Sequence, residues 1–349
     1  MWPILIGAIL LTYVGCDQNK NIIYDDECYP SETTVSGTYA PSCTFCSGSL
    51  IFAEEFDEFN LQTWEHIFDP NKEGFYTLVN SRRNSFTEDG VLFLRPSISS
   101  DQCATCKTNP VVTAAIRTTK SFSFRYGRVE IRAKLPAGDW LTPALWLLPA
   151  SSVQYGPWPS SGHISIMHSR GNRILLHNGK NIGIQSANAG LSYGISQQSA
   201  LIQNQFSRIN ESGYNRDFHF YQLEWTPDSI KFSVDDVEIG KIDPGADGFW
   251  KYGKFDSNSR NLNPWRSGSK MAPFDQQFYL EIDLTMGGIN GNFPDDVQNP
   301  TPKPWSNSSP NAGADFWKGR DSWLPTWGLD RNDGRDASFQ IDYVRVWAL

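Results

Sequence analysis

The alternation of apolar and polar residues, repeated along most of the chain, constrains its fold more than any other feature. In the segment GRVEIRAKLP every second residue from Val129 to Leu135 is apolar, and the residues between them are charged. This spacing is typical of a β-strand with one buried and one solvated face. Comparable runs fill residues 218–242, 278–286 and 339–349, and we find neither an internal repeat nor an amphipathic helix of three turns. The pattern predicts an all-β chain that folds as a sandwich or jelly roll.

Composition divides the chain into three parts. Residues 1–16 form an apolar run of signal-peptide length that is too short to span a bilayer, and residues 17–48 are polar and rich in Ser, Thr, Pro and Cys. We therefore expect a cleaved signal peptide, a Cys-containing N-terminal extension and one β-domain over residues 49–349, in a secreted protein. Lipidation of Cys16 is the alternative. Within the β-domain, residues 290–336 are rich in Asn, Pro, Gly and Trp and are expected to form one long ordered loop.

The charge of the chain limits its partners. The formal net charge is -8, and no run of Lys or Arg occurs. Nucleic acids and anionic membranes attract basic patches, so neither is expected as a partner, and no membrane insertion is expected. An uncharged ligand fits this balance.

The cysteines favour disulfides over a metal site. Two pairs, in CTFC and CATC, have the spacing of a four-cysteine zinc site, but thiols in a secreted chain usually oxidise. The pairing is left open, and one cysteine lacks a partner if Cys16 leaves with the signal peptide. Sequons at Asn210 and Asn307 predict a glycoprotein. The six cysteines are Cys16, Cys28, Cys43, Cys46, Cys103 and Cys106.

A set of motifs spreads over residues 49–349. In order, these include GSLIFAEEFDEFNLQTWEH, FRYGRVEIRAKLPAGDWLTPALWLLP, DFHFYQLEWTPDSIKF, SKMAPFDQQFYL, GRDSWLPTW and IDYVRVWAL. The set resembles the laminarinase-like members of glycoside hydrolase family 16, and among them the invertebrate β-1,3-glucan recognition proteins, also called Gram-negative bacteria-binding proteins. The resemblance implies a concanavalin-like β-jelly roll with a concave cleft for β-glucan. Many such proteins also carry an amino-terminal immunoglobulin-like module, for which residues 17–48 are too few.

The segment GHISIMHSRGN, residues 162–172, resembles the active-site strand of that family except at three positions. Active members have Gly-Glu-Ile-Asp-(Ile/Leu)-Met-Glu-Ser-Arg-Gly-Asn, and the resemblance places His163 at the nucleophile, Ser165 at the supporting Asp and His168 at the acid. A one-residue bulge after Ser165 would turn His168 back into the cleft. Retaining hydrolysis needs two carboxyl groups about 5 to 5.5 Å apart, so we predict a catalytically inactive homologue.

Other interpretations of these residues stay open. His168 could donate a proton, and relocated carboxylates would leave a residual β-1,3-glucanase. A metal-assisted reaction would need a third histidine near His163 and His168, for which His177 and His219 are candidates, but no His-x-His spacing occurs and no catalytic metal is expected. In the simplest interpretation the histidines fill the space of the carboxylates and hydrogen-bond neighbours or sugar hydroxyls.

Sugar binding calls for aromatic platforms and planar polar groups. The resemblance implies that Trp146 and Trp158 lie near the cleft and Asn80 on its rim, and that the three substituted positions also contact the ligand. Thr142 in DWLTPA stands where relatives usually have a tryptophan, and the loop after Trp64 is short. These two departures favour the alternative of a protein-interaction module that has lost sugar binding.

The resemblance implies a secreted, non-catalytic β-1,3-glucan-binding pattern-recognition protein of innate immunity. Its expected partners are β-1,3-glucan or a related microbial polysaccharide and components of a serine-protease cascade. No cofactor is expected, apart from a structural Ca²⁺ that some family members bind on the outer face, here with Asp342.

Overall fold

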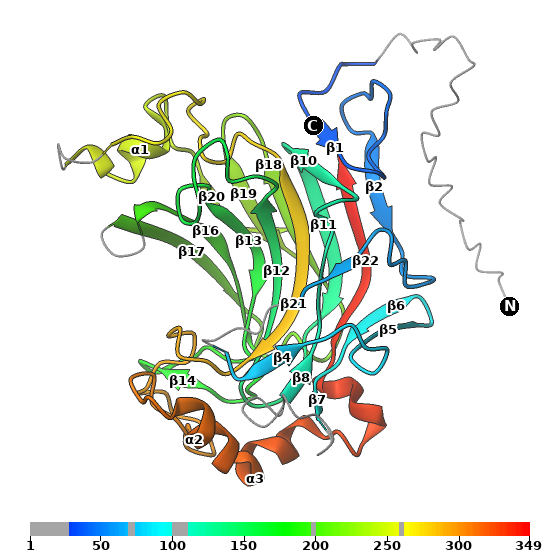
Figure 1. Cartoon of the computed structure of the whole chain (residues 1–349), viewed down its shortest axis with the longest axis vertical. Helices are drawn as coiled ribbons and strands as arrows, with labels where there is room; N and C mark the ends of the chain where they lie inside the picture. The colour runs from blue at the N-terminus through cyan, green and yellow to red at the C-terminus, as the bar shows by residue number, and fades with distance from the viewer. Residues whose placement is uncertain (1–27, 69–73, 100–110, 197–199, 258–261) are drawn as a thin grey trace, which may run out of the picture.

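Two curved antiparallel β-sheets stacked face to face make up the body of the molecule (Figure 1). The computed structural model describes residues 28–68, 74–99, 111–196, 200–257 and 262–349. The predicted all-β jelly-roll sandwich is confirmed, and strands form in all three predicted runs, at residues 218–242, 278–286 and 339–349.

The first sheet has nine strands, in the order β1-β10-β21-β12-β13-β16-β17, with β9 paired to β21 and β3 paired to β9. Its strands are β1 (Thr34–Ser36), β3 (Glu65–His66), β9 (Ala115–Arg117), β10 (Ser123–Arg125), β12 (Leu141–Pro149), β13 (His163–His168), β16 (Ser186–Ser196), β17 (Ala200–Ile209) and β21 (Phe278–Met286).

The second sheet has eight strands, in the order β20-β19-β18-β11-β22-β6-β5, with β2 paired to β22. Its strands are β2 (Leu50–Glu54), β5 (Ser85–Glu88), β6 (Val91–Leu94), β11 (Gly127–Lys134), β18 (His219–Trp225), β19 (Ile230–Val234), β20 (Val237–Ile242) and β22 (Phe339–Trp347).

The core lies between the two sheets and is formed by one face of each. Leu145 and Leu147 of β12 are fully buried there, as are Trp225 and Phe232 of the second sheet. Burying each such side chain stabilises the fold by about 1.5–3 kcal/mol. Because side chains alternate along a strand, Trp146 between the two leucines points away from this core. The outer face of the nine-stranded sheet is therefore free to form a site.

Short elements cover the ends of the sandwich. These are β4 (Tyr76–Leu78), β7 (Ser97–Ile98), β8 (Val111–Thr113), β14 (Leu176–His177), β15 (Lys180–Asn181), α1 (Gly248–Tyr252), η1 (Phe255–Ser257), α2 (Ala312–Lys318), α3 (Arg320–Trp323), η2 (Leu324–Trp327) and η3 (Asn332–Ala337). Residues 290–336 thus contain short helices, where the sequence predicts only a loop. These helices have no three-turn apolar repeat, and ring contacts such as Phe316 on Trp323, at 4.5 Å between centroids, hold them in place.

The N-terminal segment from residue 28 is tied to the sandwich. Cys28 forms a disulfide with Cys46, and β1 pairs with β10 at the edge of the nine-stranded sheet. Cys43 is also disulfide-bonded. The disulfide prediction is therefore confirmed at Cys28 and Cys46, and Cys46 is not a zinc thiolate. The remaining cysteines and the predicted signal peptide, residues 1–16, lie outside the described residues. No helix in the described part is long and apolar enough to cross a membrane.

Candidate functional site

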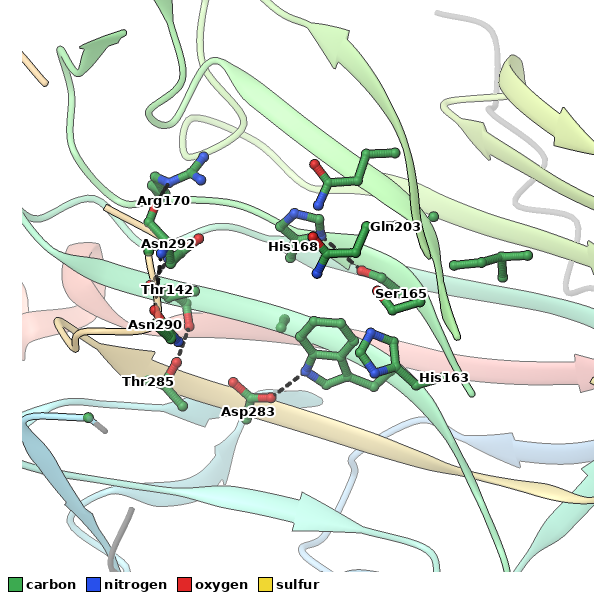
Figure 2. Close-up of a pocket in the computed structure, with 18 of the residues that line it drawn as sticks. Thr142, His163, Ser165, His168, Arg170, Gln203, Asp283, Thr285, Asn290 and Asn292 are labelled. Atoms are coloured by element: carbon green, nitrogen blue, oxygen red, sulfur yellow. Dashed lines mark hydrogen bonds between the residues drawn. The ribbon is translucent and has the colours of Figure 1, made fainter. Parts of the chain in front are cut away.

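A cavity of about 500 Å³ lies on the outer face of the nine-stranded sheet (Figure 2). Strands β12, β13, β16, β17 and β21 supply its floor, and residues 287–292 close one end. This volume is in the range of small-ligand sites in proteins. Trp146, His163, Ser165 and His168, four of the residues expected to bind sugar, all line it.

A bulge in β13 brings these side chains to one face. Trp146 of β12 pairs with Ser165 and Leu145 pairs with Met167, so Ile166 has no residue opposite it. The extra residue shifts the alternation by one position, and His168 therefore faces the cavity together with Ser165. The predicted bulge after Ser165 is confirmed.

A glycine starts this strand for steric reasons. Gly162 has φ of +66°, and a Cβ on it would lie 2.9 Å from the ring of Phe274. No larger side chain fits that conformation without strain. Gly162 thus fixes the direction in which His163 enters the sheet.

Aromatic rings hold the two histidines. The ring of His163 stacks on Trp158 at 4.6 Å between centroids, and it meets Trp146 edge-on at 5.1 Å. The ring of His168 is nearly parallel to Trp146 at 6.0 Å, and its Nδ1 is 2.9 Å from Ser165 Oγ. The side chains of His163, Ser165 and His168, together with Trp146 and Trp158, thus form one packed group.

The two imidazoles are uncharged at neutral pH. Burial lowers the pKa of His163 to about 4. Burial, together with the charge of Arg170 and the proximity of His163, lowers the pKa of His168 to about 3. The positions that the resemblance assigns to nucleophile and acid therefore carry no charge, and neither ring holds the second, acidic N–H proton that it would need to protonate a leaving oxygen at neutral pH.

Two carboxyl groups that the sequence analysis missed lie on the same face, in β21. Asp283 lines the cavity, and its Oδ2 accepts a hydrogen bond of 2.6 Å from Trp146 Nε1 (Figure 2). Burial raises the pKa of Asp283 to about 7. Burial and the proximity of Asp283 raise the pKa of Glu281 to about 8. The sequence contains the information needed to predict that Glu281 and Asp283 lie together, because the alternation in FYLEIDLTM puts the two acids on one face of the strand.

The opposite end of the cavity from His163 is polar (Figure 2). Thr142 Oγ1 accepts a hydrogen bond of 3.0 Å from Asn292 Nδ2, and Arg170 Nε donates to the carbonyl oxygen of Asn292 at 2.6 Å. These bonds attach residues 290–292 to the sheet. No aromatic side chain stands at position 142, and Trp146 and Tyr76 are the aromatic residues that line the cavity.

The other expected site residues lie apart from the cavity floor. Trp158 reaches the site through its contact with His163 and is 38% exposed. Asn80 lines a separate groove beside Glu65 and Arg117.

The structure does not bring a third histidine to the pair in β13. His177 lies 3.3 Å from Asp296, and His219 lies 2.9 Å from Asp235, and neither lines the cavity. The three-histidine interpretation is therefore wrong. On the outer face of the second sheet, the carboxylate of Asp342 pairs with Arg132. Within the described ranges, no three His, Cys, Asp or Glu side chains cluster as metal ligands would.

Comparisons with known proteins agree with this fold. The family model of glycosyl hydrolases family 16 matches residues 190–275. The laminarinase from Rhodothermus marinus superposes with a TM-score of 0.58, at 22% identity, over 86% of this chain and 96% of the enzyme. That likeness concerns the fold.

Curated relatives are closer in sequence. A β-1,3-glucan-binding protein of Penaeus monodon is 39% identical, over 86% of this chain and 90% of the relative. Gram-negative bacteria-binding protein 1 of Drosophila melanogaster is 32% identical, over 92% of this chain and 68% of the relative. The chain therefore belongs to the family of β-1,3-glucan-binding and Gram-negative bacteria-binding proteins, which have a domain of the glycoside hydrolase family 16 type.

Proposed function

We propose that the protein binds β-1,3-glucan in the cavity on the nine-stranded sheet and does not hydrolyse it. One observation carries this proposal: the β13 bulge presents His163, Ser165 and His168, all uncharged, on a floor that keeps the indole of Trp146. An oxocarbenium-like transition state needs a carboxylate beside it, and a neutral imidazole offers none. A sugar ring needs only an apolar platform and hydrogen-bonding edges, which the cavity supplies.

The relatives support this ligand by their names, which state that they bind β-1,3-glucan or Gram-negative bacteria. From the same relatives we propose that the protein is secreted and acts in innate immunity. Once bound to microbial glucan, it would engage components of a serine-protease cascade. Co-purification of proteases with the glucan-bound protein, and not with the free protein, tests that second step.

Binding is tested with insoluble β-1,3-glucan. We expect the protein to sediment with it, to be displaced by laminarin-type oligomers, and not to sediment with cellulose. Trp146→Ala removes the platform and is expected to weaken binding about tenfold or more. Tyr29→Ala is the matched control, because this tyrosine is 76% exposed and lies on the N-terminal segment. Equal sedimentation of the two variants would contradict the assignment of the cavity.

A residual hydrolase is the second candidate, because Asp283 and Glu281 bring carboxyl groups to the cleft face. The two side chains are two residues apart on one strand and do not flank a space between strands, so we expect no reducing ends to form from β-1,3-glucan. If activity is found and Asp283→Asn abolishes it, the non-catalytic assignment is wrong.

Restoring the three acidic side chains tests whether the cavity still has the geometry of a hydrolase active site. In His163→Glu with Ser165→Asp and His168→Glu, the bulge would place three carboxyl groups where a retaining hydrolase has them. We expect slow release of reducing sugar from β-1,3-glucan by this variant and none by the wild type. His163→Gln with His168→Gln, which restores no acid, is the control and is expected to stay inactive.

A further inference from the structure

The polar end of the cavity contains a cation that no acid neutralises. Arg170 lines the cavity there, beside Asn292 and Thr142 (Figure 2). Burial lowers the pKa of its guanidinium to about 10, so the group is still charged at neutral pH. Arg170 forms no ion pair with any carboxylate of the described residues. A partly buried charge without a counter-ion is costly to the folded protein.

The guanidinium of Arg170 is oriented by the backbone but is not saturated. Its Nε donates to the carbonyl oxygen of Asn292 at 2.6 Å, and its Nη1 donates to the carbonyl oxygen of Ile182 at 3.3 Å. Both acceptors are uncharged, and the ring of Phe293, 6.0 Å from Cζ, is apolar. Over the ranges that the structure describes, no acceptor bonds Nη2. That nitrogen therefore keeps two N–H groups with which to bind a ligand.

The rest of the lining supplies no counter-ion at this end. The charge of Arg170 lowers the pKa of His168, and both imidazoles of the cavity are neutral. Asp283 is the one acidic side chain among the lining residues, and its Oδ2 is bonded to Trp146 Nε1 at the other end. Since its pKa is about 7, the Asp283 carboxyl is only partly ionised at neutral pH. The Arg170 end of the cavity is therefore positively charged.

A carboxylate is the group that this end would hold best. A sugar hydroxyl can accept a bond from Nη2, but it leaves the charge of Arg170 uncompensated. Hydrogen bonds between a guanidinium and a carboxylate are about twice as strong as bonds between neutral groups, and the two planar groups match in shape. The net charge of -8 opposes an acidic ligand only at long range, because salt at about 0.1 M screens charges beyond about 10 Å.

We propose that the cavity selects acidic saccharides, and that Arg170 is the residue that determines this specificity by pairing with a carboxylate group on the bound sugar. The inference rests on the proposed function, since it concerns a saccharide in the same cavity. It adds the charge of the preferred ligand, which the family resemblance does not supply.

The test compares two β-1,3-linked glucose oligosaccharides of equal length by titration calorimetry. One is neutral, and the other has its primary alcohols oxidised to carboxylates. We expect the wild type to bind the oxidised ligand about tenfold more tightly, and this advantage to shrink as NaCl is added. A sulfated oligosaccharide of the same length distinguishes a carboxylate site from a general anion site, and we expect it to gain less than the oxidised one.

Two variants of His168 separate the charge of Arg170 from its structural bonds. His168→Glu puts a carboxylate beside Arg170 and leaves the bonds to Asn292 and Ile182 in place, so the preference for the oxidised ligand should disappear. His168→Gln adds no charge and should keep the preference, whatever it does to the affinity for both ligands.

Removing the cation itself gives the complementary result. Arg170→Gln should also lose the preference, and its thermal unfolding is measured alongside because two backbone bonds are lost. Arg216→Gln is the control of equal charge change, because Arg216 is exposed and does not line the cavity. It should bind both ligands in the wild-type ratio.

Three outcomes overturn the inference. Equal binding of the neutral and oxidised ligands to the wild type would show that Arg170 selects no acid, while the proposed function stands. A gain for the sulfated ligand alone would contradict the carboxylate assignment. If none of the ligands binds the wild type, the proposed function itself fails, and the inference fails with it.

Discussion

His163 and His168 are held by indole rings and a serine hydroxyl, not by acids, and this difference in neighbours decides their chemistry. The sequence could predict that both face the cleft with Ser165, because a bulge in the strand is the geometry that aligns these positions. It could not predict their pKa values. Those depend on burial by Trp146 and Trp158, which come from other segments and meet the histidines only after folding.

Asp283 gives the protein a pH-dependent stability with a definite sign. Its pKa is about 7 in the folded protein and about 3.9 in an unfolded chain, so the folded state holds the proton more tightly. The protonated Asp283 contributes at most about 4 kcal/mol to the free energy of unfolding. This contribution is fully present below pH about 4 and is lost as the pH rises through about 7. Glu281 acts in the same direction.

Urea unfolding between pH 5 and 8 measures this effect. We expect the free energy of unfolding to fall less steeply with pH in Asp283→Asn than in the wild type, because the amide cannot ionise. Glu238→Gln, on an exposed position of β20, should keep the wild-type slope. Identical slopes in all three proteins would refute the role of Asp283.

Whole strands were more predictable than single side chains. The bounds of β21 coincide with the run FYLEIDLTM, because a period of two over nine residues has no helical alternative. The helices in residues 290–336 were not predictable in the same way. None exceeds seven residues, and their stability comes from contacts such as Trp305 on Trp140, far apart in the chain.

The two sequons lie in different local structures and should differ in glycosylation. Asn307 Nδ2 donates to the carbonyl oxygen of Phe293 at 3.0 Å, and its Oδ1 accepts from Lys303 Nζ at 2.9 Å. A glycan on that nitrogen would disturb both bonds. The side chain of Asn210 bonds within a local turn, in which its Oδ1 accepts from the backbone N–H of Ser212 at 3.0 Å.

Mass spectrometry of protein secreted by eukaryotic cells tests this difference. We expect a glycan on Asn210 and none on Asn307, and Asn210→Gln should remove the mobility shift that deglycosylation produces. Full occupancy of Asn307 in folded protein would contradict the expectation.

For the molecule as a whole, the sandwich and its cleft follow from the alternating pattern and from family resemblance, and the comparisons confirm both. The boundary at residue 49 stays a prediction, although the pairing of β1 with β10 attaches the preceding segment to the body. The separate groove that Asn80 lines could not be predicted, because it combines β3, β9 and the loop at Asn80, whose proximity only the assembled sheet reveals.

The carboxylate expected to bind calcium, that of Asp342, lies on the outer face of the second sheet. Asp342 is paired with Arg132, and a cation at that carboxylate would have to displace the guanidinium. We therefore expect the midpoint of thermal unfolding to be the same in excess Ca²⁺ and in EDTA. A rise with Ca²⁺ that Asp342→Asn abolishes would establish the site instead.

The neutral group of His163, Ser165 and His168 also has a kinetic consequence. A hydrolase ends each encounter by cutting the polymer that it holds, so the lifetime of its complex is limited by turnover. A cleft without that step releases its ligand only by dissociation, and every additional sugar contact lengthens the stay. In the proposed function, a cleft without acids therefore holds its glucan longer than a hydrolase would, which leaves time for slower assembly events to follow.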